Sequence, residues 1–391
     1  MRPLDGITVV SLEQAVAAPF ATRQLADLGA RVIKIERPGD GDFARAYDSK
    51  VNGLSSYFVW LNRTKESLTL DLKRREATDV LHRLLERADV FVQNVAPGAS
   101  ARLGTDAAAL RGRYPRLIVC DVTGFGSSGP YATKKAYDLL VQAEVGAVSV
   151  TGTEDAPSKV GISIADIAAG MYAYSGILAA LLARATSGQG TTVEVSLFDA
   201  LAEWMAAPMY YTAYGGHAPA RSGAHHASIA PYGPFRVKDD TIFVAVQNAR
   251  EWTRFCATVL EWPELERDDR FATNSLRVHN RVGLHQAIES TLGPLTGAEV
   301  VARLERASIA YARMNSIEQF IAHPQLTERD CWREIGSPVG PLRALVPPVR
   351  MDGYAPALGP VPAVGQHTDG ILRELGVTDA TIAAWRREGV I

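Results

Sequence analysis

The alternation of short β-rich runs with helical stretches through the first half of the chain constrains the fold most strongly. The predicted strands cover residues 7–12, 31–36, 68–72, 90–94, 117–122 and 192–195. Strands joined by helical crossovers form βαβ units, so we expect an α/β fold with a mainly parallel, doubly wound sheet. Ligands of such sheets bind beyond the carboxyl ends of the strands. The loops after Leu12, Glu36, Asn94 and Val122 are therefore the first places to look for a site.

The character of the sequence changes near residue 215, where Gly-Gly-His-Ala-Pro resembles a linker. Beyond it, short strands around a hairpin-like turn precede helices rich in Arg and Glu, which indicates a second, smaller α+β domain. We predict a large Rossmann-like domain over 1–200, a linker over 201–220, a small domain over 221–320, and a return segment over 321–391 that packs on the large domain.

Charge and composition exclude several classes of protein. Lys and Arg number 41 against 43 Asp and Glu, which leaves no basic footprint for nucleic acid. Three widely spaced cysteines without a C-x-x-C motif argue against a disulfide framework and against a metal site. The apolar stretch 167–183 is interpreted as a buried helix rather than a membrane span, and Asp5 interrupts any signal peptide. We expect a cytoplasmic protein with no nucleic-acid or membrane partner.

A literal G-x-G-x-x-G motif runs from Gly124 to Gly129 after a predicted strand. A dinucleotide site needs a helix to open at the third glycine, but Pro130 follows instead. We therefore interpret this motif as a glycine-rich turn that shapes a substrate pocket. The loops at 37–45 and 94–102 also follow strands and carry arginines, which suits an anionic ligand, although neither loop is specific by itself.

Asp166 is the most informative single residue. It lies near the start of the apolar helix, among Ile, Ala and Gly, where desolvation penalises a carboxylate that has no partner or function. One interpretation is a helix-capping aspartate, favoured by the helix dipole. The other is a nucleophile that attacks an activated acyl group and forms a covalent intermediate. The residues alone leave both open.

Several weak signals occur in a characteristic order. The chain carries, in sequence, residues 17–19 (Ala-Ala-Pro), 25–38, Gly41 with Asp42, Arg45, 70–73, Asn94 with Arg102, 124–126, Tyr137 with Asp138, Asp166 with Gly170, 188–190, 231–233 and Trp252. This series resembles the class III CoA-transferases, the superfamily of formyl-CoA transferase, carnitine CoA-transferase and α-methylacyl-CoA racemase. The resemblance covers nearly the whole chain. Residues 13–19 and 224–231 look most like the branch that handles C4–C5 dicarboxylates such as mesaconate, itaconate and citramalate.

The resemblance implies an interlocked homodimer and a covalent mechanism on Asp166. The aspartate would attack the donor thioester, pass through a mixed anhydride and an aspartyl-CoA thioester, and hand CoA to the acceptor acid. Coenzyme A thioesters would be substrates, with no prosthetic group. The CoA-binding roles carry over to Gln14, Ala15, Val16, Ala17, Arg37, Leu70, Lys73, Asn94, Arg102, Leu103 and Lys135.

The same resemblance suggests substrate contacts and leaves alternative activities open. Candidate substrate residues are Tyr137, Asp138, Arg45, His225 and His226. We expect transfer of CoA from a donor such as succinyl-CoA to a short carboxylic or dicarboxylic acid. The alternatives are an α-methylacyl-CoA racemase, an intramolecular CoA-transferase, or a CoA-binding protein without catalysis. Tyr137 stands where the racemase branch has a histidine base, which weakens the racemase alternative.

Overall fold

A computed structural model describes all 391 residues of the chain, which divide into two compact units. The first unit comprises residues 1–145, 161–205 and 327–391, and the second comprises 146–160 and 206–326. Two differences from the predicted ranges stand out. Residues 146–160 join the second unit, where Gly152 accepts a hydrogen bond from the amide of Gly223. Part of the predicted linker is a helix, α10 (Ala206–Gly215).

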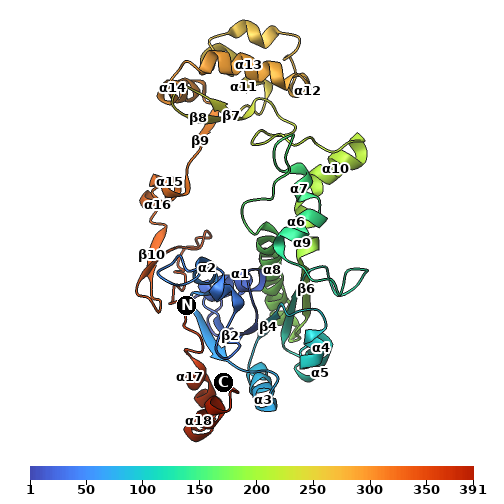
Figure 1. Cartoon of the computed structure of the whole chain (residues 1–391), viewed down its shortest axis with the longest axis vertical. Helices are drawn as coiled ribbons and strands as arrows, with labels where there is room; N and C mark the ends of the chain where they lie inside the picture. Colours follow the sequence, from blue (N-terminus) through green and yellow to red (C-terminus); the bar gives the residue numbers. More distant parts are fainter. The chain divides into compact units, whose positions relative to one another are not determined.

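The first unit is built on a six-stranded sheet in which every pairing is parallel (Figure 1). The strands are β1 (Thr8–Leu12), β2 (Arg31–Glu36), β3 (Lys65–Thr69), β4 (Val90–Gln93), β5 (Ile118–Thr123) and β6 (Thr192–Ser196). Their order is β3-β2-β1-β4-β5-β6, the doubly wound arrangement, so the prediction of an α/β fold with a parallel sheet is confirmed. The strand order reverses between β1 and β4, which places a ligand crevice beyond their carboxyl ends.

The third strand begins earlier in the sequence than predicted. Its first buried residues are polar, so the hydrophobic pattern does not reveal them. The prediction covered 68–72, whereas β3 pairs with β2 from Lys65 to Thr69. Lys65 and Ser67 are buried and bonded to the carboxylates of Glu13 and Glu36. Leu68 of the same strand is buried and apolar, but a search for hydrophobic runs cannot detect the first half of a strand when the buried side chains there are polar.

Helices cover both faces of the sheet, because right-handed crossovers that run in opposite directions from β1 and β4 fall on opposite faces. The remaining elements of this unit are η1 (Phe43–Ala46), α1 (Ala17–Asp27), α2 (Ser56–Asn62), α3 (Arg75–Leu85), α4 (Ala99–Leu103), α5 (Ala107–Arg113), α6 (Asp138–Glu144), α8 (Ile164–Ser187), α9 (Leu197–Trp204), β10 (Trp332–Ile335), β11 (Leu342–Leu345), α17 (Thr368–Glu374) and α18 (Asp379–Arg387). One hydrophobic core joins the sheet to α3, α5, α17 and α18.

Helix α8 contains the predicted apolar stretch and is long and apolar enough, by length and composition alone, to cross a membrane. A core helix passes the same test, and α8 packs on α1, β5 and β6. Gly170 permits the close crossing with α1, because a Cβ atom there would lie 2.6 Å from the carbonyl oxygen of Ala17. This crossing brings the first turn of α8 to the loop that follows β1.

The second unit is a small α+β structure with its own core, as predicted. Its antiparallel sheet holds β7 (Tyr232–Arg236), β8 (Thr241–Ala245) and β9 (Ala310–Arg313). Its helical elements, including the one that crosses the boundary at residue 326, are α7 (Ala147–Val150), α10, α11 (Ala249–Arg254), η2 (Phe255–Val259), η3 (Pro263–Arg267), α12 (Asn274–His279), α13 (Arg281–Leu292), α14 (Gly297–Ala307), α15 (Ile317–Ile321) and α16 (Pro324–Glu328). Phe235, Trp252 and Phe255 belong to its core.

A buried ion network lies under the carboxyl ends of β1 to β3. The ammonium of Lys65 is 2.7 Å from Oε1 of Glu13 and also donates to Asn62. The ammonium of Lys34 is 2.7 Å from Asp42 and 3.7 Å from Glu13. The side chains of Glu13, Lys34, Asp42 and Lys65 are inaccessible to solvent. Every charge here depends on its partners, because an unpaired buried charge is strongly destabilising.

Replacement of Lys65 by Met should therefore destabilise the first unit. The change strands the Glu13 carboxylate and should lower the free energy of unfolding by about 3–5 kcal/mol. Urea unfolding followed by intrinsic fluorescence measures the loss. Lys73→Met serves as the control, because Lys73 is exposed and has no ion pair. Equal urea midpoints for the two variants would show that the ion network does not contribute to the free energy of unfolding as proposed.

Candidate active site

Two adjoining cavities open at the carboxyl edge of the sheet. The larger, of about 940 Å³, is lined from the loops after β1, β2, β3 and β4. The smaller, of about 650 Å³, is lined from the loops after β1, β4 and β5 and from the first turn of α8. Gln14, Asn94, Val95 and Ala96 line both cavities, so one ligand can reach from one into the other.

Free cations give the larger cavity its charge. Arg37, Lys73 and Arg102 line it, and none of their charged side-chain groups forms an ion pair. The cavity's buried acids are already neutralised: Glu36 pairs with Arg45, and Asp42 and Glu13 belong to the ion network. Against three free cations, only the carboxylate of Asp71 lacks a cationic partner, and it accepts the amide of Lys73. This charge balance suits a polyanionic ligand.

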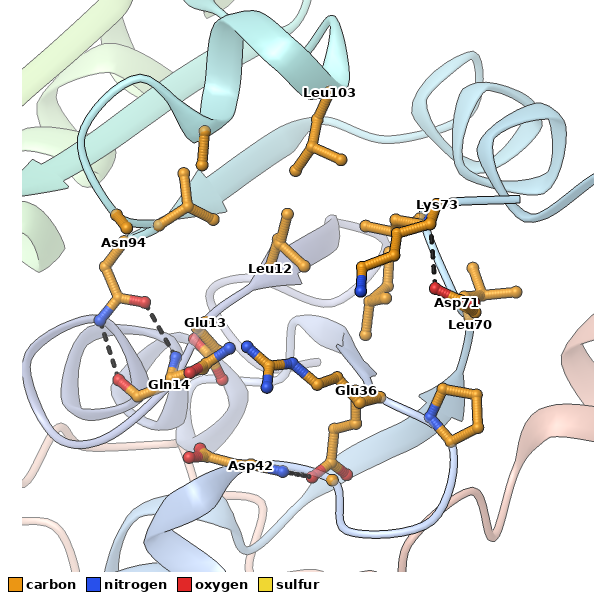
Figure 2. A pocket seen from close by; sticks show the side chains of 18 of the residues that line it. Leu12, Glu13, Gln14, Glu36, Asp42, Leu70, Asp71, Lys73, Asn94 and Leu103 are labelled. Atoms are coloured by element: carbon orange, nitrogen blue, oxygen red, sulfur yellow. Dashed lines mark hydrogen bonds between the residues drawn. The ribbon is translucent and has the colours of Figure 1, made fainter. Parts of the chain in front are cut away.

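Asn94 fixes the wall that the two cavities share. Its side-chain oxygen accepts the amide of Gln14, and its side-chain nitrogen donates to the Gln14 carbonyl, both at 2.8 Å. Figure 2 shows this pair on one side of the larger cavity and Lys73 on the opposite side. The reciprocal bonds hold the loop after β1 to the loop after β4, across the point where the strand order reverses.

The ion network sets the backbone of the loop after β1. Ala15 has a φ of +63°, a left-handed conformation that is uncommon for a residue with a side chain. Oδ1 of Asp42 accepts its amide at 3.2 Å, while Oδ2 of the same carboxylate binds Lys34. Helix α1 then begins at Ala17 with no side-chain cap. Pro19, its third residue, has no amide hydrogen, but the amides of Ala17 and Ala18 form no hydrogen bond within the protein and remain for an oxygen atom of a ligand in the smaller cavity.

Asp166 lies half-buried in the smaller cavity, in the first turn of α8. Its carboxylate receives no hydrogen bond from the protein, and it does not cap the helix. Burial, followed by the nearby negative charge of Asp138, raises the pKa of Asp166 to about 7. A carboxylate that is partly desolvated and left unbonded keeps its lone pairs available for attack on an electrophile.

Aromatic side chains form part of the lining of the smaller cavity. Phe43, Tyr47 and Tyr57 follow one another in edge or tilted contacts, and Tyr137 also lines the cavity. The hydroxyl groups of Tyr47, Tyr57 and Tyr137 have no hydrogen-bond partner within the protein. Burial, together with Asp42 and Asp166, raises the pKa of Tyr47 to about 12, so this phenol keeps its proton.

The structure brings most of the predicted site residues together. All eleven predicted CoA-binding residues line one cavity or the other, and Tyr137, Asp138 and Asp166 line the smaller one. Gly124 of the glycine-rich motif lines the smaller cavity as well, and no helix opens before α6. Their roles toward a ligand stay predictions.

Three predicted substrate residues are placed differently. Arg45 lines neither cavity: its guanidinium binds both carboxylate oxygens of Glu36 and lies 3.6 Å from the ring centroid of Phe58. His225 and His226 belong to the second unit. There His226 stacks on Tyr232, and the ring of His225 lies 4.2 Å from that of His285. Each of the three side chains therefore already has a partner within the protein.

The sequence suggested no role for Asp42, Tyr47 or Tyr57. Asp42 belongs to the ordered series of weak signals, but only the structure shows that its carboxylate positions the Ala15 backbone. Tyr47 and Tyr57 come from the segment between β2 and β3 and lie outside that series. A signal did exist for the tyrosines, since aromatic residues at 43, 47, 57 and 60 are dense for a connecting segment.

Known proteins resemble this chain over nearly its whole length. The family described as CoA-transferase family III matches residues 4–368. The succinyl-CoA:glutarate CoA-transferase of Mus musculus is 33% identical over 96% of this chain and 87% of its own. The succinyl-CoA–D-citramalate CoA-transferase of Chloroflexus aurantiacus is 30% identical over 100% of this chain and 98% of its own. A CAIB/BAIF family protein from Brucella suis superposes with a TM-score of 0.83 at 34% identity, covering 96% of this chain and 99% of that one.

The raised pKa of Asp166 predicts a pH-dependent stability. The folded chain holds this proton more tightly than the unfolded chain, whose aspartate has a pKa near 3.8. The protonated Asp166 side chain therefore makes its full contribution to the free energy of unfolding below about pH 4. This contribution is lost as the pH rises toward about 7. Asp166→Asn should therefore raise the urea midpoint clearly at about pH 8 and only slightly at about pH 4.5.

The exposed Asp155 offers the matched control, because Asp155→Asn should leave the midpoint unchanged at both pH values. An equal effect of Asp166→Asn at both pH values would show that Asp166 titrates normally in the folded chain.

Proposed function

Because the chain belongs to CoA-transferase family III, we propose that it moves CoA from a donor thioester such as succinyl-CoA to a short dicarboxylic acid through a covalent intermediate on Asp166. The acceptor class includes mesaconate, itaconate, citramalate and glutarate. The observation that carries the proposal is the unbonded carboxylate of Asp166, in a cavity that shares a wall with a larger, cationic cavity.

The larger cavity fits the nucleotide end of CoA. That end carries a pyrophosphate and a ribose phosphate, and Arg37, Lys73 and Arg102 offer three unpaired cations. The apolar lining from Leu12, Ile35, Leu70, Leu72 and Leu103 suits the adenine ring and the pantetheine arm. The thioester would then pass the Gln14–Asn94 wall and reach Asp166.

The chemistry divides one exchange into steps that the site can support. An oxygen of Asp166 attacks the donor carbonyl, and CoA thiolate leaves as an acyl-aspartyl anhydride forms. The thiolate attacks the aspartyl carbonyl, which releases the donor acid and leaves an aspartyl-CoA thioester. The acceptor carboxylate attacks this thioester and expels the thiolate, forming a second anhydride. The thiolate then attacks the acceptor's carbonyl and regenerates Asp166. The free amides at the start of α1 are suited to stabilise the oxyanions.

The smaller cavity favours an acyl group with a polar end. Three tyrosine hydroxyls without protein hydrogen-bond partners face a ligand there, together with the unpaired ammonium of Lys135. A distal carboxylate can accept hydrogen bonds from such groups, whereas a simple hydrocarbon chain would leave them unsatisfied. The names of the mouse and Chloroflexus relatives, which specify dicarboxylates for those proteins, point the same way.

A homodimer and a cytoplasmic location also belong to the proposal. Met209, Tyr210 and Tyr214, which lie close together in sequence on the helix α10, are more than half exposed. Contiguous exposed apolar surface typically marks an interface. Sedimentation in solution should give twice the mass of one chain.

The racemase alternative makes a different chemical demand. It needs a base and an acid on opposite sides of the α carbon. The cavity offers Asp166 as one of these groups. The position of the second base is occupied by Tyr137, a phenol in place of an imidazole. Incorporation of deuterium from heavy water into a 2-methylacyl-CoA, with no transfer to any acid, would favour the racemase.

The direct test of the transferase is product formation. Wild-type protein incubated with succinyl-CoA and mesaconate, itaconate, citramalate or glutarate should yield new CoA esters detectable by mass spectrometry. Asp166→Asn should reduce the rate by at least about a thousandfold, because no other carboxylate replaces the nucleophile. The surface variant Asp155→Asn should retain full activity. Full activity of Asp166→Asn would overturn the covalent mechanism.

The cationic cavity predicts how CoA is held. Lys73→Ala and Arg102→Ala should each weaken CoA binding about tenfold at low salt, because each loses a charge-assisted bond to phosphate. Calorimetric titration with CoA measures the change. Arg75→Ala is the control, since its side chain is 92% exposed and lines neither cavity. Equal losses in all three variants would indicate non-specific attraction rather than a phosphate site.

A further inference from the structure

We propose that Asp138 is a positioning residue for Asp166: it holds the first turn of α8 through backbone amides and sets the charge against which the Asp166 carboxylate ionises. The inference rests on the proposed function of Asp166. The sequence alone suggested that Asp138 contacts the substrate. The structure supports a different role for this residue.

The hydrogen bonds of Asp138 carry the first part. Its Oδ1 accepts the amide of Ala165 at 2.8 Å and lies 3.4 Å from the amide of Asp166. Its Oδ2 accepts the side-chain amide of Gln142 at 2.7 Å. Both oxygens are therefore engaged within the protein, which leaves Asp138 a poor candidate for holding a substrate carboxyl group or proton.

Helix α8 needs such a partner at its first turn. The residue before the helix, Ser163, makes no side-chain cap. The first amides of a helix have no partner within the helix, and a negative charge there is favourable. Asp138 supplies both the acceptor and the charge from the first position of another helix, α6. Because Asp166 is the third residue of α8, this bond also fixes the direction of its carboxylate.

The electrostatic part follows from the same closeness. The acidic and phenolic groups that face Asp166 are Asp138 from α6, Tyr137 just before α6, and Tyr47 just after η1. Lys134 and Lys135 line the same cavity, but Lys134 pairs with Glu144. Neither ammonium forms an ion pair with Asp138 or Asp166, so no salt bridge offsets the charge of Asp138. A like charge disfavours ionisation, so wild-type Asp166 becomes reactive only as the pH rises.

Two variants separate the two effects. Asp138→Asn keeps an oxygen for the amide of Ala165, but it replaces the acceptor of the Gln142 side chain, which also donates to the carbonyl of Ile162, with an NH₂ group. Because it removes the negative charge, the acid limb of the pH–rate profile should move about one unit or more toward acid. At about pH 8 its kcat should stay within about threefold of wild type, because Asp166 is ionised in both proteins.

Asp138→Ala removes the acceptor as well. Its kcat should fall at least about tenfold below that of Asp138→Asn at every pH, because the nucleophile loses its fixed direction. The dissociation constant for CoA should not change, since Asp138 does not line the larger cavity. An unmoved acid limb in Asp138→Asn, or a raised KM for the acceptor without any pH shift, would overturn the proposal and favour substrate contact.

A stability cycle tests the same coupling without activity. The gain in urea midpoint from Asp166→Asn at about pH 8 should shrink when Asp138 is already Asn, because the repelling charge is gone. An unchanged gain would contradict the electrostatic coupling. If the cycle shows coupling while wild-type protein forms no CoA ester with any acid, the proposed function fails and the coupling of Asp138 to Asp166 stands.

Discussion

The pairing of Asp42 with Lys34 underlies the whole site. One carboxylate oxygen neutralises a lysine that is fully buried under the sheet, and the other holds the left-handed Ala15 backbone at the cavity. Glu13, next to Gln14, is fixed by the same network through Lys65. Removing Lys34 would leave the buried Asp42 carboxylate without a cation, and removing Asp42 would leave Lys34 with Glu13 alone, 3.7 Å away, so the network and the loop must form together.

This arrangement separates two kinds of charge in one small volume. Acids beneath the cavities are satisfied by buried cations, which leaves the surface cations Arg37, Lys73 and Arg102 unpaired toward solvent. Asp166 differs from these acids, because its neighbour is the acid Asp138 and neither of the two forms an ion pair. A carboxylate in that position is available for chemistry, whereas one with a lysine partner would be occupied.

The sequence predicted the parallel sheet and the place of Asp166 near the start of an apolar helix, because apolar periodicity reports these features directly. It gave no strand order, so the reversal between β1 and β4 comes from the structure alone. It did not predict the position of β3, where Lys65 and Ser67 are buried through polar contacts. It also did not predict that Asp42 and Asp138 each hold the backbone of a distant residue. Their importance depends on residues 27 positions away in each case, at Ala15 and at Ala165, and only the folded chain brings these together.

The discontinuity of the first unit has a consequence for synthesis on the ribosome. Helices α17 and α18 supply Ile371, Leu372 and Ile382 to the core beneath the sheet, and the carbonyl of Val390 accepts the amide of Asp71 beside the larger cavity. A nascent chain that has emerged only as far as the second unit would have α3 and α5 on this face of the sheet, but part of the face would stay uncovered. The second unit, continuous except for residues 146–160, can fold earlier. The nascent sheet is therefore the part of this protein for which we expect chaperones to matter.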